Sequence, residues 1–192
     1  MTDISESTEN VQPARGPLPE VGSSVHFKCT VGDASLRLGE RDYRGIDFTG
    51  DIYLTVKANP GNPPGKSAQL EVTGLKFTAT HEDLGQVTLD PTDVKSPDSI
   101  LELVQPIPPR FRHNLLLHFQ VTVEQPPQAR AYAAREPLVL RTKEPAKLLS
   151  PELSKFPPDG DFYKLESPIN LVHPDDDQVI ATIDKFPIRV GG

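Results

Sequence analysis

The sequence contains very little cysteine, methionine or tryptophan. Cys29 is its only cysteine, Met1 is its only methionine, and tryptophan is absent. One cysteine cannot form an internal disulfide, and it cannot supply the paired thiolates of a structural zinc site. A chain of 192 residues can bury enough apolar surface to be stable without such links. We therefore expect residues 21–192 to form a single β domain, preceded by a flexible acidic arm over residues 1–20.

Long apolar runs and an excess of positive charge are also missing. No segment approaches the roughly 20 apolar residues that a membrane-spanning helix needs, and the formal net charge is −7. An acidic chain lacks the basic face that binds nucleic acid or an anionic membrane surface. The amino-terminal residues have neither the basic nor the apolar region of a secretory signal. We predict a cytoplasmic protein that binds neither nucleic acid nor membranes; secretion of a chain without its leader is the alternative.

Proline, by contrast, is abundant and unevenly distributed. The sequence contains 21 prolines, and because proline breaks helix interiors, an all-helical fold is excluded. Alternation of apolar and polar residues, which is typical of half-buried strands, is strongest where proline is absent. Proline therefore marks the loops between strands. No proline lies within residues 20–59, 65–90, 110–125 or 175–186, and these four segments hold the best alternating strands.

Short alternating segments separated by turn residues predict an all-β, antiparallel fold. Counting them gives about 8–10 strands, a number typical of sandwiches and barrels. At most two short helices are expected, within residues 128–136 and 148–155. No strand–helix alternation indicates a parallel sheet. We predict an antiparallel β-sandwich, with a small closed β-barrel as the alternative.

Two long segments change the face that carries their apolar residues. In residues 69–80 the change falls across Gly74, and in residues 178–190 it falls near Asp184. A regular strand would turn half of these side chains to water. We therefore predict a β-bulge at Gly74 and a second bulge or bend near Asp184, where Pro187 also indicates a strand edge or a bulge.

Recognisable catalytic motifs are missing. No GxSxG elbow, P-loop, dinucleotide-binding GxGxxG or HExxH motif occurs. Cys29 lies on the apolar face of its predicted strand, which indicates a buried structural thiol and not a nucleophile. We expect the five histidines at the surface, with a metal or catalytic role as the alternative. No catalytic residue is assigned, and whether the protein is an enzyme stays open.

Candidate binding residues lie in a proline-rich loop and in a local basic cluster. Loops on a rigid strand scaffold often carry binding surfaces. Arginine side chains can hold phosphate or carboxylate groups. The candidates for ligand or partner binding are Asn59, Asn62 and Lys66 in the loop, and Arg110, Arg112 and His113 in the basic cluster.

The densest group of oxygen ligands is the run Asp175, Asp176 and Asp177. Calcium prefers oxygen ligands, so this run is a candidate calcium site. A solvated acidic turn between two strands is the simpler interpretation, because successive residues of an extended chain point in different directions. No other cofactor is indicated.

Three functional hypotheses fit these features. The main one is a non-enzymatic β-sandwich module that binds a protein partner or small ligand through its proline-rich loops. The alternative is a β-barrel that binds a small hydrophobic ligand, or that acts as a cofactor-free cyclase or isomerase. The third is a calcium-dependent carbohydrate-binding module, which the lack of tryptophan disfavours because aromatic rings often stack on ligands. A homodimer is compatible with the exposed edges of a sandwich.

Overall fold

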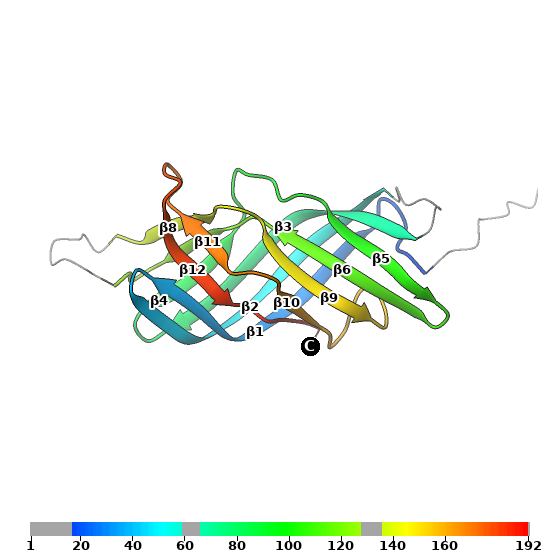
Figure 1. Ribbon diagram of the computed structural model, residues 1–192, viewed down its shortest axis with the longest axis horizontal. Coiled ribbons are helices and arrows are strands. Elements are labelled where there is room, and N and C mark those ends of the chain that lie inside the picture. The colour runs from blue at the N-terminus through cyan, green and yellow to red at the C-terminus, as the bar shows by residue number, and fades with distance from the viewer. Residues whose placement is uncertain (1–16, 59–65, 128–135, 192) are drawn as a thin grey trace, which may run out of the picture.

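The computed structural model describes residues 17–58, 66–127 and 136–191, and all regular elements within them are β-strands (Figure 1). Thirteen antiparallel strands form one ring-like sheet. The all-β, antiparallel class is therefore confirmed, with more strands than expected. The helical turn predicted within 148–155 is wrong, because β9 (Ala146–Leu153) covers most of it. Most of the other predicted helix, 128–136, lies outside the described residues. Within the described residues, no helix has the length and apolarity of a membrane span.

Three long strands lie side by side in the sheet: β1 (Ser24–Leu38), β2 (Arg41–Ala58) and β3 (Ser67–His81). Ten shorter strands complete the sheet. They are β4 (Gly85–Asp90), β5 (Ser99–Pro106), β6 (Pro109–Leu117), β7 (Gln120–Val123), β8 (Leu138–Thr142), β9, β10 (Phe162–Leu165), β11 (Ile169–Val172), β12 (Val179–Lys185) and β13 (Ile188–Val190).

The sheet closes on itself twice. Pairing of β12 with β1 closes ring A, which consists of β1, β2, β3, β4, β7, β8, β11 and β12. Pairing of β3 with β5 closes ring B, which consists of β1, β2, β3, β5, β6, β9, β10 and β13. Both rings share the three long strands. This closure corresponds to the barrel alternative and not to the sandwich, because a sandwich has two sheets with free edges and here every strand has a partner on both sides.

The chain crosses from one ring to the other five times, and each crossing is a connection between two of the shorter strands (Figure 1). These passages are the connections β4–β5, β6–β7, β8–β9, β10–β11 and β12–β13. Pro145, Pro168 and Pro187 lie in the last three of them. Proline cannot donate a ladder hydrogen bond, so it suits the points where a strand stops. The bend predicted near Asp184 is confirmed, since β12 ends at Lys185.

The bulge predicted at Gly74 is also confirmed. Tyr53 on β2 pairs with Gly74, and the next β2 residue pairs with Val72, which leaves Thr73 as the extra residue of β3. An inserted residue reverses the facing of the strand beyond it. The two halves of β3 therefore both send apolar side chains inward, and Leu70 and Leu75 are both buried.

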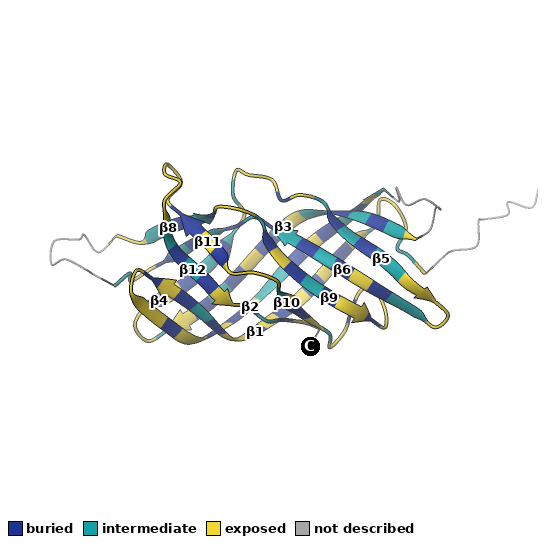
Figure 2. Ribbon diagram, viewed as in Figure 1, coloured by how far each residue is buried: buried dark blue, intermediate teal, exposed yellow. Residues whose placement is uncertain are grey.

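Apolar side chains fill the interior of both rings, and buried and exposed residues alternate along the strands (Figure 2). Where the rings meet, the Phe186 ring lies 5.6 Å from that of Phe48 and 5.8 Å from that of Phe77, centroid to centroid. Gly50 on β2 leaves the space that this packing needs. A Cβ atom at Gly50 would lie 2.2 Å from the Lys76 carbonyl oxygen and 2.6 Å from the Phe77 ring.

Candidate functional site

Three polar side chains meet inside ring B. Ser99 begins β5, His113 lies on β6 and Tyr163 lies on β10, and each has an exposed fraction of 0%. His113 Nε2 is 3.1 Å from Ser99 Oγ, and His113 Nδ1 is 2.6 Å from Tyr163 Oη. Alternate residues of a strand face the same side, so one inward position on each of three strands builds the cluster.

The hydrogen bonds of this cluster form a chain in which each group donates to the next, from Tyr163 through His113 and Ser99 to the Leu70 carbonyl oxygen. Ser99 Oγ donates to the Leu70 carbonyl oxygen at 3.3 Å, so its lone pairs accept the hydrogen of His113 Nε2. His113 Nδ1 then accepts the phenolic hydrogen of Tyr163. This pattern assigns the Nε2–H tautomer and satisfies both ring nitrogens.

The surroundings of the cluster favour uncharged groups. Burial lowers the pKa of His113 to about 3 and raises that of Tyr163 well above its ordinary value. The rings of Phe27 and Phe156 stand edge-on to the imidazole, at centroid distances of 6.1 and 5.5 Å. A neutral imidazole donates and accepts hydrogen bonds but supplies no cation, so the cluster is suited to fixing the positions of three strands.

The sequence-based placement of His113 at the surface is wrong. It shares the inward face of β6 with Phe111, whereas Arg110 and Arg112 face outward. Arg110 Nε lies 3.5 Å from a carboxylate oxygen of Glu152, and Arg112 lies 3.6 Å from one of Glu102. Both guanidinium groups thus have carboxylate partners, and anion binding by this cluster stays a prediction.

The predicted loop site is only partly described. Asn59 and Asn62 lie outside the described residues. Lys66 is exposed, and its carbonyl oxygen accepts a hydrogen bond from the Leu103 amide at 2.7 Å. Ligand or partner binding by this loop stays a prediction.

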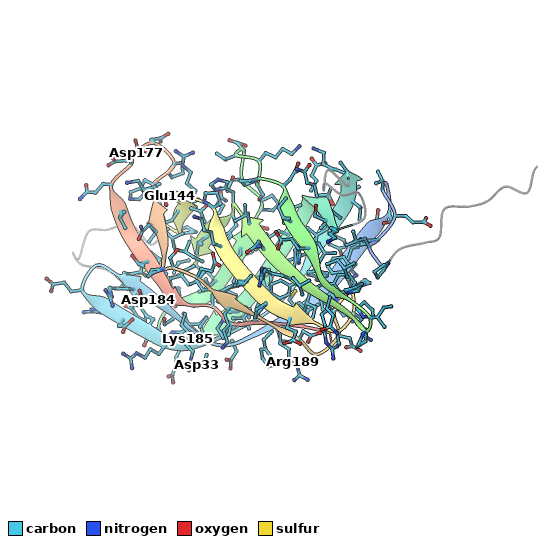
Figure 3. All side chains as sticks on the ribbon, turned by 45° about the vertical axis from the view of Figure 1, so that its right-hand side comes forward. Asp33, Glu144, Asp177, Asp184, Lys185 and Arg189 are labelled. Atoms are coloured by element: carbon cyan, nitrogen blue, oxygen red, sulfur yellow. The ribbon has the colours of Figure 1, made fainter. Side chains whose placement is uncertain are left out.

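The acidic run Asp175–Asp177 forms the exposed turn between β11 and β12, with Asp177 projecting outward (Figure 3). Asp176 Oδ1 accepts a hydrogen bond from the Gln178 amide at 3.1 Å. Among the described residues no group of three or more His, Cys, Asp or Glu side chains is arranged to hold a metal ion. The geometry fits the interpretation as an acidic turn, and calcium binding stays a prediction.

Cys29 points inward from β1 and is 4% exposed. Burial raises the pKa of its thiol to about 12, and the charge of Asp51 adds to this effect. A thiol with such a pKa stays protonated at neutral pH and is a poor nucleophile. The interpretation of Cys29 as a buried structural residue is therefore confirmed.

An apolar hollow of about 520 Å³ lies at the end of ring A where β1 ends and β2, β8 and β12 begin. The side chains of Leu38, Leu138 and Ile180 line it and also pack against the core. Its volume falls within the range of small-molecule sites. Sequence reasoning missed this hollow, because its residues come from four separate segments. The full lining is Leu38, Gly39, Glu40, Arg41, Pro126, Pro127, Leu138 and Ile180.

A second hollow has a different character. It lies on the outer face of the long strands and has a volume of about 400 Å³. Polar and charged side chains dominate its lining, including Lys28, Thr30 and Lys76. This surface provides a matched control position for the apolar hollow.

The overall arrangement has a counterpart among solved structures. The fold resembles that of DynF. This protein, from the dynemicin biosynthesis pathway of Micromonospora chersina, superposes with a TM-score of 0.68 over 92% of this chain and 83% of DynF. The two sequences are 16% identical, so the likeness to DynF concerns the fold alone. No protein-family model and no curated protein sequence matches this chain.

Proposed function

We propose that this protein binds a small apolar molecule at the open end of ring A. The observation that carries the proposal is the hollow of about 520 Å³ lined by Leu38, Leu138 and Ile180. Closed rings of eight strands suit a single small ligand. The resemblance to a protein of a biosynthesis pathway is in keeping with a small-molecule ligand. These features support the barrel hypothesis better than the sandwich module acting through proline-rich loops.

The apolar area that a ligand buries sets an upper limit on its affinity. Burial of about 250 Å² gives about 6 kcal/mol of transfer free energy, from which the cost of association is subtracted. Before that subtraction the free energy corresponds to a Kd of roughly 10–100 µM. We therefore expect dye binding with a Kd of roughly tens of micromolar or weaker.

The test uses N-phenyl-1-naphthylamine, a neutral dye whose fluorescence rises in apolar surroundings. Leu138→Trp fills the hollow with a large ring, and Ile180→Gln makes its wall polar. Thr30→Trp places the same ring on the polar outer hollow and serves as the control. We expect the wild type and Thr30→Trp to bind the dye alike, and the two hollow variants to bind at least about tenfold more weakly.

Circular dichroism establishes that each variant is folded before dye binding is compared. Failure of the wild type to bind the dye contradicts the proposal. So does unchanged binding in both folded hollow variants, because the dye would then occupy another surface.

A further inference from the structure

Negative charge gathers around the apolar hollow. The turns at this end of ring A connect β1 to β2, β3 to β4, β7 to β8 and β11 to β12. Their described parts, with the first residue of β2, contain eight carboxylates and one guanidinium, Arg41. Arg130 and Arg135 fall between β7 and β8 in the sequence and lie outside the described residues. The carboxylates are Glu40, Glu82, Asp83, Glu124, Glu136, Asp175, Asp176 and Asp177.

These carboxylates differ from those at the end of ring B. There Glu102, Glu152 and Asp159 each lie within 3.6 Å of a cationic side chain. In the part of the chain that the structure describes, no ion pair neutralises the eight carboxylates around the hollow. The potential at the end of ring A is therefore negative, because eight carboxylates outnumber Arg41 and the two further arginines that the sequence has between β7 and β8.

We infer that the ligand of this hollow is an apolar molecule that carries one positive charge, such as a protonated amine. The inference rests on the proposed function and specifies its ligand class. The apolar part contacts Leu38, Leu138 and Ile180, while the ammonium group stays at the rim. Glu40 belongs to the lining itself and gives the nearest negative charge. Arg41 also belongs to the lining, but the surrounding carboxylates outnumber it.

Charge of this kind acts over a limited distance. At low ionic strength the Debye length reaches about 30 Å, and at 1 M salt it is about 3 Å. The carboxylates of all four turns therefore act together on a ligand at low salt. At high salt only those beside the ligand contribute, so the preference for a cation should weaken.

The experiment compares two competitors that share one alkyl chain. Decylamine, which is protonated at neutral pH, and decanoate each displace N-phenyl-1-naphthylamine from the wild type. We expect decylamine to displace the dye at a concentration about tenfold lower than decanoate in 10 mM salt. In 0.5 M sodium chloride the ratio should fall at least about threefold.

Two triple variants with the same change of net charge test whether the preference for decylamine comes from the carboxylates near the hollow. The first is Asp175→Asn with Asp176→Asn and Asp177→Asn, and the control is Glu102→Gln with Glu152→Gln and Asp159→Asn. We expect the first to reduce the amine-to-carboxylate ratio at least about threefold and the control to leave it within about 1.5-fold. An equal reduction by both would show an effect of net charge and overturn the inference.

The outcomes separate this inference from the proposed function. Dye binding without a preference for decylamine overturns only the inference about charge. Absence of dye binding at the hollow overturns both, because the site itself is then missing.

Discussion

His113 shows how a polar side chain is accommodated in an apolar interior. Burying an imidazole without hydrogen bonds is costly, and Ser99 and Tyr163 supply a partner for each nitrogen. A protonated imidazole would need an acceptor at both nitrogens, but the Tyr163 hydroxyl donates to Nδ1 in the observed arrangement. Phe27 and Phe156 offer no alternative acceptor. The charged form is therefore disfavoured in the fold.

This environment makes stability depend on pH. The pKa of His113 is about 3 in the fold and about 6.5 in an unfolded chain. Between these values only the unfolded chain takes up the proton. The contribution of His113 is complete above the unfolded pKa and is lost as the pH falls towards 3. We predict that the free energy of unfolding falls by about 2 kcal/mol more between pH 7 and pH 5 in the wild type than in His113→Asn.

Urea unfolding at the two pH values measures this difference. His118, whose pKa burial also lowers, is present in both proteins, so its contribution cancels. If His113→Asn is too unstable to compare, the ¹⁵N chemical shifts of the His113 ring are measured in the wild type instead. They should indicate a neutral imidazole at pH 5. Identical pH dependence, or a protonated ring at pH 5, would count against the burial effect.

The sequence contained part of this information. His113 has the same parity as Phe111 and Leu115, so alternation alone places it on the inward face. Its polarity argued for the surface, because a lone buried histidine needs partners. Those partners come from β5 and β10, and no local pattern reveals that these strands meet β6 in one interior.

Gly50 allows β2 to lie close against Phe77 of β3 where the two rings meet. A Cβ atom there would overlap the Lys76 carbonyl group and the Phe77 ring. We predict that Gly50→Ala lowers the free energy of unfolding by more than about 2 kcal/mol, since overpacking here forces the backbone of β3 to move. Gly32→Ala is the matched control on β1, because a Cβ atom at Gly32 meets nothing within 4 Å.

Urea denaturation followed by circular dichroism measures both variants. The control should stay within about 1 kcal/mol of the wild type. A Gly50→Ala protein as stable as Gly32→Ala would contradict the prediction. It would show that Phe77 and the β3 backbone can shift at the junction at little cost in free energy.

The lengths of β1 and β2 were harder to predict than their existence. Alternation in residues 24–31 is regular, but it is disturbed at Asp33, which has a φ of 56°. Asp33 accepts a hydrogen bond from the Gly45 amide and one from Lys185 (Figure 3). These contacts hold a bulge, after which β1 continues to Leu38. The bulge moves the inward side chains from odd-numbered to even-numbered positions, and this change hid the continuation of β1 in the sequence.

The two rings form one structural unit because they share β1, β2 and β3. Unfolding either ring exposes the interior face of strands on which the other depends. We predict a single cooperative transition. The absence of tryptophan allows Tyr43→Trp to report on ring A and Phe156→Trp to report on ring B, each as the sole tryptophan.

Each variant is unfolded in urea and followed by tryptophan fluorescence and by circular dichroism. The two signals should give the same midpoint within each variant. A fluorescence midpoint that differs from the circular dichroism midpoint in either variant would mean that the rings unfold separately.

At this scale the sequence predicted the class of fold but not its closure. Antiparallel strands and proline-rich connections followed from local patterns. Closure depends on pairs such as Leu38 with Ala181 and Cys29 with Val190, which join distant parts of the chain. Alternation defines a strand's two faces and carries no information about its neighbours, so sandwich and barrel could not be distinguished.

The pairing of β1 with β12 and β13 has a consequence for biosynthesis. A ribosome makes β1 first among the described strands and its closing partners last. At about 5–20 residues per second, roughly 7–30 seconds separate Leu38 from Val179. Throughout this interval the nascent chain has an unpaired β1 edge, which can pair with other chains. Protection of that edge by chaperones should therefore influence the yield of this protein.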